Sequence, residues 1–197
     1  MEKTVSSYAQ MTAFDTECLE AFSRWLGGMP AEVGALCDVL ERPAELASEM
    51  PDACRVASAE SLAHLVRSLD LIPDGVEALG YLENLFAFRA IMRGAVGTSP
   101  EAAGADPTFA RLASEADLVA SFLGDDFARL LEASARAQER TRPGQSSRDL
   151  LDDAELRSAA LMQVRAWAAT YSAPELALTE AELIKLRSFM RVRLGRA

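Results

Sequence analysis

The stretch DLIPDGVEALGYLENL, residues Asp70–Leu85, carries the strongest fold signal in the chain. Pro73 cannot continue a helix from the residues before it, because it lacks an amide proton and its ring clashes with the preceding turn. Asp74 then stands at an N-cap position, and Glu77 follows three residues later, which is the spacing of a capping box. The stretch therefore predicts a turn between two helices.

The helix after this turn is expected to lie at the centre of the protein. Apolar residues surround it on most sides, as is typical of a buried helix. Gly80, Ala87 and Gly94 recur every seven positions and predict a seam of small residues, over which another helix can pass closely. Glu83 and Ala90 lie beside this seam. A carboxylate there needs hydrogen-bond donors, because an unpaired buried charge costs several kcal/mol.

Helical periodicity continues through the other apolar segments, and no alternating run of β-branched residues predicts a strand. The expected helices in the first half of the chain cover about 14–26, 30–49, 58–69 and 75–94. Gly27-Gly28 is expected to end the first of them, and Pro30 to open the second. The pattern predicts an all-α bundle of six to eight helices, with the helix at about 75–94 as its central apolar element.

The second half of the chain begins after a linker expected at residues 97–108, and its helices are expected within 107–195. Asp106-Pro107 supplies an N-cap and a first helical residue, and Gly124 is a candidate hinge. Ser146 precedes Asp149 by three residues, and Thr179 likewise precedes Glu182, so both pairs predict capping boxes of later helices.

Composition is that of a globular protein and argues against several functions. Half of the 197 residues are hydrophobic and a quarter are charged, which suits one domain, residues 1–197, with a proper core. The net charge of −10 argues against nucleic acid as a partner, since nucleic acid attracts basic surfaces. The sequence contains no recognisable signal peptide or membrane span, so we expect a soluble, cytoplasmic protein.

Cysteine and histidine point to no particular chemistry. Cys18, Cys37 and Cys54 are 19 and 17 residues apart, which fits neither a zinc site nor a disulfide framework, and we expect reduced, buried thiols. His64 is the single histidine and lies on the expected polar face of its helix. We expect a surface residue rather than a catalytic base, because no nucleophile motif accompanies it.

The sequence of the hairpin resembles a known family. Asp-Leu-Ile-Pro-Asp at 70–74, followed by Leu-Gly-Tyr-Leu at 79–82, is similar to the core motif of the YkvA-like domains, P-x-D-L-I-P-D-x-I-P-x-L-G-Y-L-D-D. These are small bacterial helical domains without an established biochemical function. The resemblance extends over residues 63–93 and implies a helical hairpin at about 58–95.

The chain departs from the family motif at three places. Ser68 replaces its first proline, Glu77 replaces its third, and Glu83-Asn84 stands where the motif has two aspartates. Many YkvA-like proteins resemble membrane-associated proteins, whereas this sequence has no segment that could span a membrane. The resemblance therefore implies a fold and leaves the function open.

Two interpretations of the hairpin's polar residues stay open. Four of them carry oxygens that suit a hard cation such as calcium or magnesium: Asp70, Asp74, Glu83 and Asn84. Alternatively, Asp70 and Asp74 cap helices, while Glu83 accepts hydrogen bonds from turn amides or from Arg67. We favour the capping interpretation because each carboxylate then has a local role, and we expect no metal and no other cofactor.

The last expected helix carries five basic residues, Lys185, Arg187, Arg191, Arg193 and Arg196. They could contact an anionic membrane, or they could complement the helix dipole and the protein's own acidic surface, which we favour. By elimination, we expect a non-catalytic interaction or scaffold module that binds a protein partner. A peripheral membrane protein that uses the basic helix is the alternative, and a metal-dependent enzyme comes third. The sequence leaves the oligomeric state open.

Overall fold

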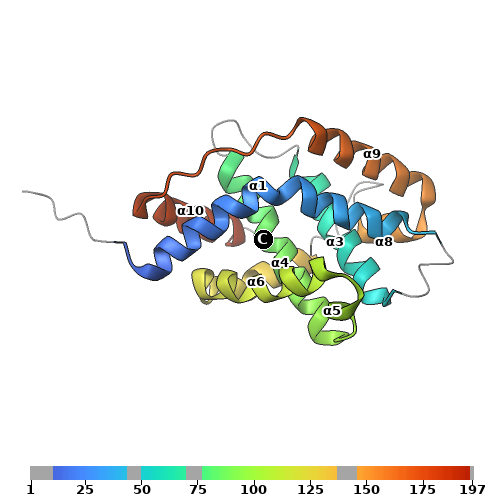
Figure 1. Ribbon diagram of the computed structural model, residues 1–197, viewed down its shortest axis with the longest axis horizontal. Coiled ribbons are helices and arrows are strands. Elements are labelled where there is room, and N and C mark those ends of the chain that lie inside the picture. The colour runs from blue at the N-terminus through green and yellow to red at the C-terminus, as the bar shows by residue number, and fades with distance from the viewer. Residues whose placement is uncertain (1–10, 44–49, 70–76, 137–145, 196–197) are drawn as a thin grey trace, which may run out of the picture.

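The computed structural model describes residues 11–43, 50–69, 77–136 and 146–195. These residues form nine helices and no strand, which confirms the predicted all-α fold (Figure 1). Their bounds are α1 Ala13–Glu41, α3 Asp52–Leu69, α4 Glu77–Thr98, α5 Ala102–Ala105, α6 Pro107–Leu123, α7 Asp126–Arg136, α8 Ser147–Asp152, α9 Ala154–Thr170 and α10 Glu180–Leu194. The number exceeds the six to eight helices expected because α5 and α8 are short, with four and six residues. Helices of this length are too short to show an apolar periodicity in the sequence.

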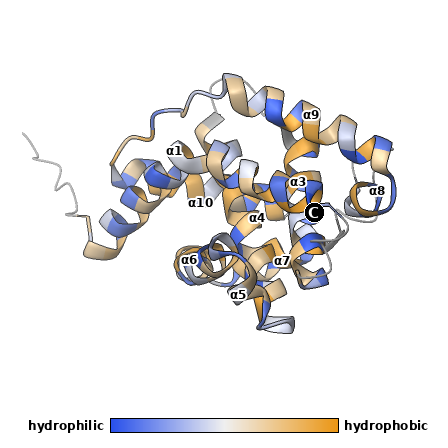
Figure 2. Cartoon of the chain, turned by 45° about the vertical axis from the view of Figure 1, so that its right-hand side comes forward, coloured by the Kyte–Doolittle hydropathy of each residue, from blue (hydrophilic) through white to orange (hydrophobic). Residues whose placement is uncertain are grey.

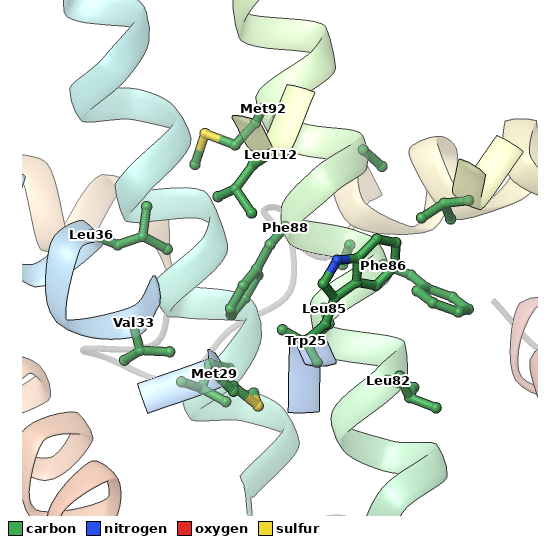
Figure 3. Close-up of a cluster of buried hydrophobic side chains, with 14 of the residues drawn as sticks. Trp25, Met29, Val33, Leu36, Leu82, Leu85, Phe86, Phe88, Met92 and Leu112 are labelled. Carbon is green, nitrogen blue, oxygen red and sulfur yellow. The ribbon is translucent and has the colours of Figure 1, made fainter. Parts of the chain in front are cut away.

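The predicted central helix is confirmed as α4, which contacts α1, α3, α6 and α7 (Figure 2). Its side chains are buried on nearly all sides, as its apolar circumference requires. Figure 3 shows the core between α4 and its neighbours, with the labelled side chains Trp25, Met29, Val33, Leu36, Leu82, Leu85, Phe86, Phe88, Met92 and Leu112. Burial of each large apolar side chain stabilises the fold by about 1.5–3 kcal/mol relative to exposure.

The expected break between residues 26 and 30 is wrong, because α1 runs without interruption from Ala13 to Glu41. Gly27 and Gly28 lie inside it, as does Pro30, which cannot donate a hydrogen bond to the Leu26 carbonyl. The hydroxyl of Tyr171 donates to that same carbonyl at 3.0 Å and so replaces the missing donor. Burial of one long face of α1 in the core favours continuation of the helix over the local preference to stop.

Helix α3 begins at Asp52, earlier than the expected start near residue 58. The predicted apolar stripe is present, since Leu62, Leu65 and Val66 are all buried. The helix starts earlier because small residues that precede this stripe, such as Cys54, are also buried and extend the packed face of the helix.

The predicted start of the helix after residue 106 is confirmed by its cap. The Asp106 side chain accepts a hydrogen bond from the Thr108 amide at 2.8 Å and so begins α6. Gly124, the expected hinge, instead ends α6 with a φ of +57°, a backbone conformation that favours glycine, and α7 is a separate helix. The expected linker at 97–108 is wrong in part, because it contains α5.

The caps in the last third of the chain also follow the sequence. Ser146 and Asp149 form the predicted capping box at the start of α8. Asp153 then ends α8 and caps α9 by accepting hydrogen bonds from the amides of Glu155 and Leu156. After α9 the chain returns in extended form along the molecule to α10 (Figure 1). There the Thr179 side chain accepts a hydrogen bond from the Glu182 amide, which is one of the two bonds of the predicted capping box.

None of the helices in the described part of the chain combines the length and the hydropathy that crossing a membrane requires.

Candidate functional site

The polar hairpin residues, for which helix caps were favoured over a cation site, are described only in part. Asp70 and Asp74 lie outside the described residues, so their capping role stays a prediction. Asn84 is fully buried in α4, and its side-chain amide donates a hydrogen bond to the Gly80 carbonyl at 3.2 Å. Within the described ranges, no group of three or more histidine, cysteine or acidic side chains is arranged to hold a metal ion.

Glu83 has a partner far away in the sequence. Its carboxylate accepts a hydrogen bond from Nε of Arg193 on α10 at 3.0 Å. Burial raises the pKa of Glu83, while the guanidinium of Arg193 opposes this rise. The expected need for a donor is thus met by an ion pair that joins α10 to α4.

His64 is half-buried, which corrects the expected surface position. Its Nε2 atom is buried and has no hydrogen-bond partner among the described residues. Burial lowers the pKa of His64 to about 4, and the positive charges of Arg67 and Arg193 contribute to the change. The imidazole is therefore neutral at pH 7, and protonating it would place a third positive charge beside these two.

The basic residues of α10 lie in ion pairs with acidic side chains of the same chain. The pairs are Lys185–Glu182 at 3.2 Å, Arg187–Asp15 at 3.6 Å, Arg191–Asp126 at 3.6 Å and Arg193–Glu83 at 3.0 Å. Arg196 lies outside the described residues. All four pairs are at least partly open to solvent, so each contributes little to stability. Lys185–Glu182 lies within α10, and the other three pairs join the basic helix to acidic groups of α1, α7 and α4.

A buried ion-pair network at the centre of the molecule was not expected from the sequence. Arg89 of α4 is fully buried and makes two hydrogen bonds to the Glu32 carboxylate of α1, at 3.0 and 3.2 Å. Glu115 of α6 lies 2.6 Å from the same guanidinium, and Arg111 bridges both carboxylates from the solvent side. The guanidinium of Arg89 also lies over the Trp25 ring, 3.8 Å from its centroid.

The network is structural in character. Its charges balance as two guanidinium groups against two carboxylates, and the pairs join three helices around the core. Burial lowers the pKa of Arg89, whereas Glu32 and Glu115 raise it, so the pairing keeps the guanidinium charged. The available sequence signal was Arg89 within the apolar run of residues 85–92, and an apolar helix that holds an arginine needs acidic partners.

A groove with an apolar lining opens between α3, α4 and α7, and we call it the α3–α4–α7 groove. It encloses about 330 Å³. Its described lining residues are Ala53, Val56, Ala57, Glu60, Ala90, Ile91, Gly94, Ala95, Thr98, Leu131 and Ser134. A pocket of this size and lining is typical of a binding site, in which apolar side chains supply contact area and a few polar groups supply orientation.

The floor of the groove includes one end of the predicted seam of small residues. Ala90 and Gly94 lie here, and a Cβ atom built on Gly94 would meet no other atom within 4 Å. The seam is therefore not covered at this end by the described part of the chain. Among the lining residues, Val56 of α3 and Leu131 of α7 are large apolar side chains that are 38% and 39% exposed.

One polar side chain in the groove has no partner. Ser134 is only 7% exposed, and its hydroxyl oxygen makes no hydrogen bond within the described residues. Most buried hydroxyls in proteins are hydrogen-bonded, so such a group is often completed by a ligand or by water. The groove can therefore bind an apolar group that also offers a hydrogen-bond donor or acceptor.

The reactive side chains elsewhere in the described chain are poorly suited to covalent chemistry. Burial raises the pKa of Cys37 and of Cys54 to about 11, and that of Cys18 to about 12. A thiol needs to ionise before it can act as a nucleophile, so these three are unreactive at neutral pH. They are free and buried, as the sequence predicted.

No protein-family model, no curated protein and no solved structure matches the chain.

Proposed function

We propose that this chain is a non-catalytic interaction module, and that it binds a protein partner in the α3–α4–α7 groove. The observation that carries the proposal is the open apolar hollow over Gly94, with Val56 and Leu131 exposed among its lining residues. Side chains of these types gain free energy when a partner removes them from water, by about 25 cal/mol for each Å² of apolar surface buried.

The non-catalytic part of the proposal is supported by the way the charged groups are used. Arg89, Glu32 and Glu115 are occupied in the central network, and Glu83 is paired with Arg193. A catalytic acid or base needs reach to a substrate. Neither of these two sets opens into the α3–α4–α7 groove, where Glu60 is the one ionisable side chain among the described lining residues. Recognition by shape and apolar contact fits this arrangement better than a reaction.

A second candidate function is peripheral membrane binding through α10. Ile184 and Val192 are more than half exposed, and they lie two helical turns apart on one face of a basic helix. Sedimentation with vesicles of anionic lipid, with and without residues 179–197, tests this candidate. Co-sedimentation that disappears with the truncation, while the truncated protein remains folded by circular dichroism, would favour it over the groove.

We also propose that the hairpin motif relates the chain to the YkvA-like domains. The motif residues 79–82 and the helical hairpin formed by α3 and α4 support this relationship. It adds no activity, because that family has no established biochemical function.

Site-specific photo-cross-linking tests the proposed function directly. A photoreactive amino acid replaces Leu131 at the groove, and in a matched control it replaces Met162 on α9, which is 71% exposed and lies outside the groove. After irradiation in the source cell, mass spectrometry should identify one protein joined at position 131 and not at position 162. Equal cross-linking at both positions, or none at position 131, would contradict the proposal.

A further inference from the structure

The dimensions of the groove favour a particular kind of partner segment. On α3 the lining extends from Ala53 to Glu60, which corresponds to about 10 Å along the helix axis. Two turns of a second helix cover the same length and present side chains at positions i, i+4 and i+7. A volume of about 330 Å³ accommodates such side chains but not a complete helix, so the backbone of the partner would rest on the rim.

The floor allows a close approach of a helix backbone. Ala53 and Ala57 on α3 are four residues apart, as are Ala90 and Gly94 on α4. Pairs of small residues at this spacing make a shallow track in which a third helix can lie near the first two, as in other tightly packed helix interfaces.

Two other common modes of peptide recognition do not fit the groove. Addition of a β-strand needs an exposed sheet edge, and the described residues contain no strand. Recognition of a polyproline segment uses grooves lined with aromatic rings, whereas no aromatic residue is found among the described lining residues. Of these three modes, a helix laid into an apolar groove is the one that fits the described lining.

Two polar groups add specificity to this apolar site. Glu60 is the ionisable residue of the described lining, and the whole chain carries a net charge of −10, so a basic side chain complements the groove. The hydroxyl of Ser134 is buried at the groove and has no hydrogen-bond partner within the described ranges, so an occupant can supply one.

We infer that the α3–α4–α7 groove receives an amphipathic helix of a partner protein, with a basic residue opposite Glu60 and a hydrogen-bonding group at Ser134. This inference rests on the proposed function, and it adds the class of segment that is bound.

Selection from a phage-displayed library of helical peptides tests the inference. Peptides are selected on the full chain and are counter-selected on the Gly94→Leu variant, in which the floor is filled. The expected consensus has apolar residues at i, i+4 and i+7 and one lysine or arginine. In a selection on Glu60→Lys, the basic preference should change to an acidic one.

The Ser134→Ala variant gives a second readout with opposite effects on binding and stability. Removing an unpaired buried hydroxyl should raise the melting midpoint of the unbound protein, while binding of the selected peptides weakens by about fivefold. Ser61→Ala is the matched control, since the Ser61 hydroxyl is also buried and unpaired in the described structure but does not line the groove. It should raise the midpoint and leave peptide affinity unchanged.

Three results would overturn the inference. The first is a consensus that is rich in proline or that alternates apolar and polar residues. The second is a preference for basic residues that persists in the selection on Glu60→Lys. The third is a library that yields no peptide whose binding is weakened by Gly94→Leu. Cross-linking at position 131 would still test the proposed function independently, so failure of the helical class and failure of the groove are distinguishable.

Discussion

The hydroxyl of Tyr171 donates a 3.0 Å hydrogen bond to the carbonyl of Leu26, the acceptor that Pro30 leaves without its helical donor. The two residues are 145 positions apart in the sequence. This bond lets α1 continue through a proline and ties it to the end of α9. Burial is the main cause that raises the pKa of Tyr171, and the neighbouring Tyr81 adds to it, so the phenol stays protonated and able to donate.

Tyr171→Phe should lower the free energy of unfolding by about 1–2 kcal/mol, because it leaves a partly buried carbonyl without a donor. In a Pro30→Ala background, the restored amide of residue 30 can satisfy Leu26, so the same substitution should cost less. Urea unfolding of the two single variants and the double variant measures the coupling. Equal costs of Tyr171→Phe in both backgrounds would mean that the hydroxyl does not compensate for the proline.

The central network predicts an order of destabilisation. Arg89→Met should cost about 3–5 kcal/mol, because it leaves two carboxylates beside the core with one remaining guanidinium partner. Glu115→Gln should cost clearly less, since that side chain is partly exposed and an amide still accepts a hydrogen bond. Midpoints of urea unfolding at pH 7 give the order. A smaller loss for Arg89→Met than for Glu115→Gln would show that the buried pair is not a main support of the fold.

His64 predicts a loss of stability in mild acid. Its pKa is about 4 in the folded protein and about 6.5 when unfolded, so between these values the unfolded chain binds more protons. Stability should therefore be complete above pH 6.5 and fall by up to about 3 kcal/mol as the pH approaches 4. The raised pKa of Glu83 has the opposite effect on stability, because the folded protein then binds more protons at that residue than the unfolded chain does. The contribution of His64 is therefore measured as the difference in the free energy of unfolding between wild type and His64→Gln at each pH. Identical pH profiles of the two proteins would contradict the prediction.

Glu83 and the hairpin predict the response to metal removal. If Glu83 serves as an ion-pair partner of Arg193, Glu83→Gln in chelator should lower the urea midpoint, and EDTA alone should leave the wild-type melting midpoint unchanged. A cation site formed with Asp70 and Asp74 makes the opposite predictions. Its clustered charges repel when the metal is absent, so Glu83→Gln would stabilise the chelated protein, and calcium or magnesium would raise the wild-type midpoint.

The features that were predictable from the sequence depend on neighbouring residues in the chain. The burial of α4 follows from its apolar circumference, the start of α8 follows from Ser146 and Asp149, and the start of α6 follows from Asp106 and Pro107. Continuation of α1 through Pro30 was not predictable, because the compensating donor comes from the far end of α9.

The candidate site was predictable only as a pattern. The seam of small residues indicated where a helix could approach, but tertiary packing decides which part of the seam is covered, and its Gly94 end is open. In the same way, the sequence indicated that Glu83 needs a donor but did not identify Arg193, which lies 110 residues away. Ser134 carried no signal, since a helical serine is normally exposed or bonded to its own helix.

The affinity of the protein cross-linked at position 131 for two glycine variants tests the central claim most directly. Gly94→Leu fills the groove, and Gly27→Leu makes the same change at a helical glycine of α1 outside it; neither added Cβ meets another atom within 4 Å. Both should fold at least as well as wild type, since glycine is a poor helix former. Binding in the α3–α4–α7 groove predicts that the dissociation constant rises at least tenfold for Gly94→Leu and stays unchanged for Gly27→Leu. Equal dissociation constants for the two variants would contradict the account.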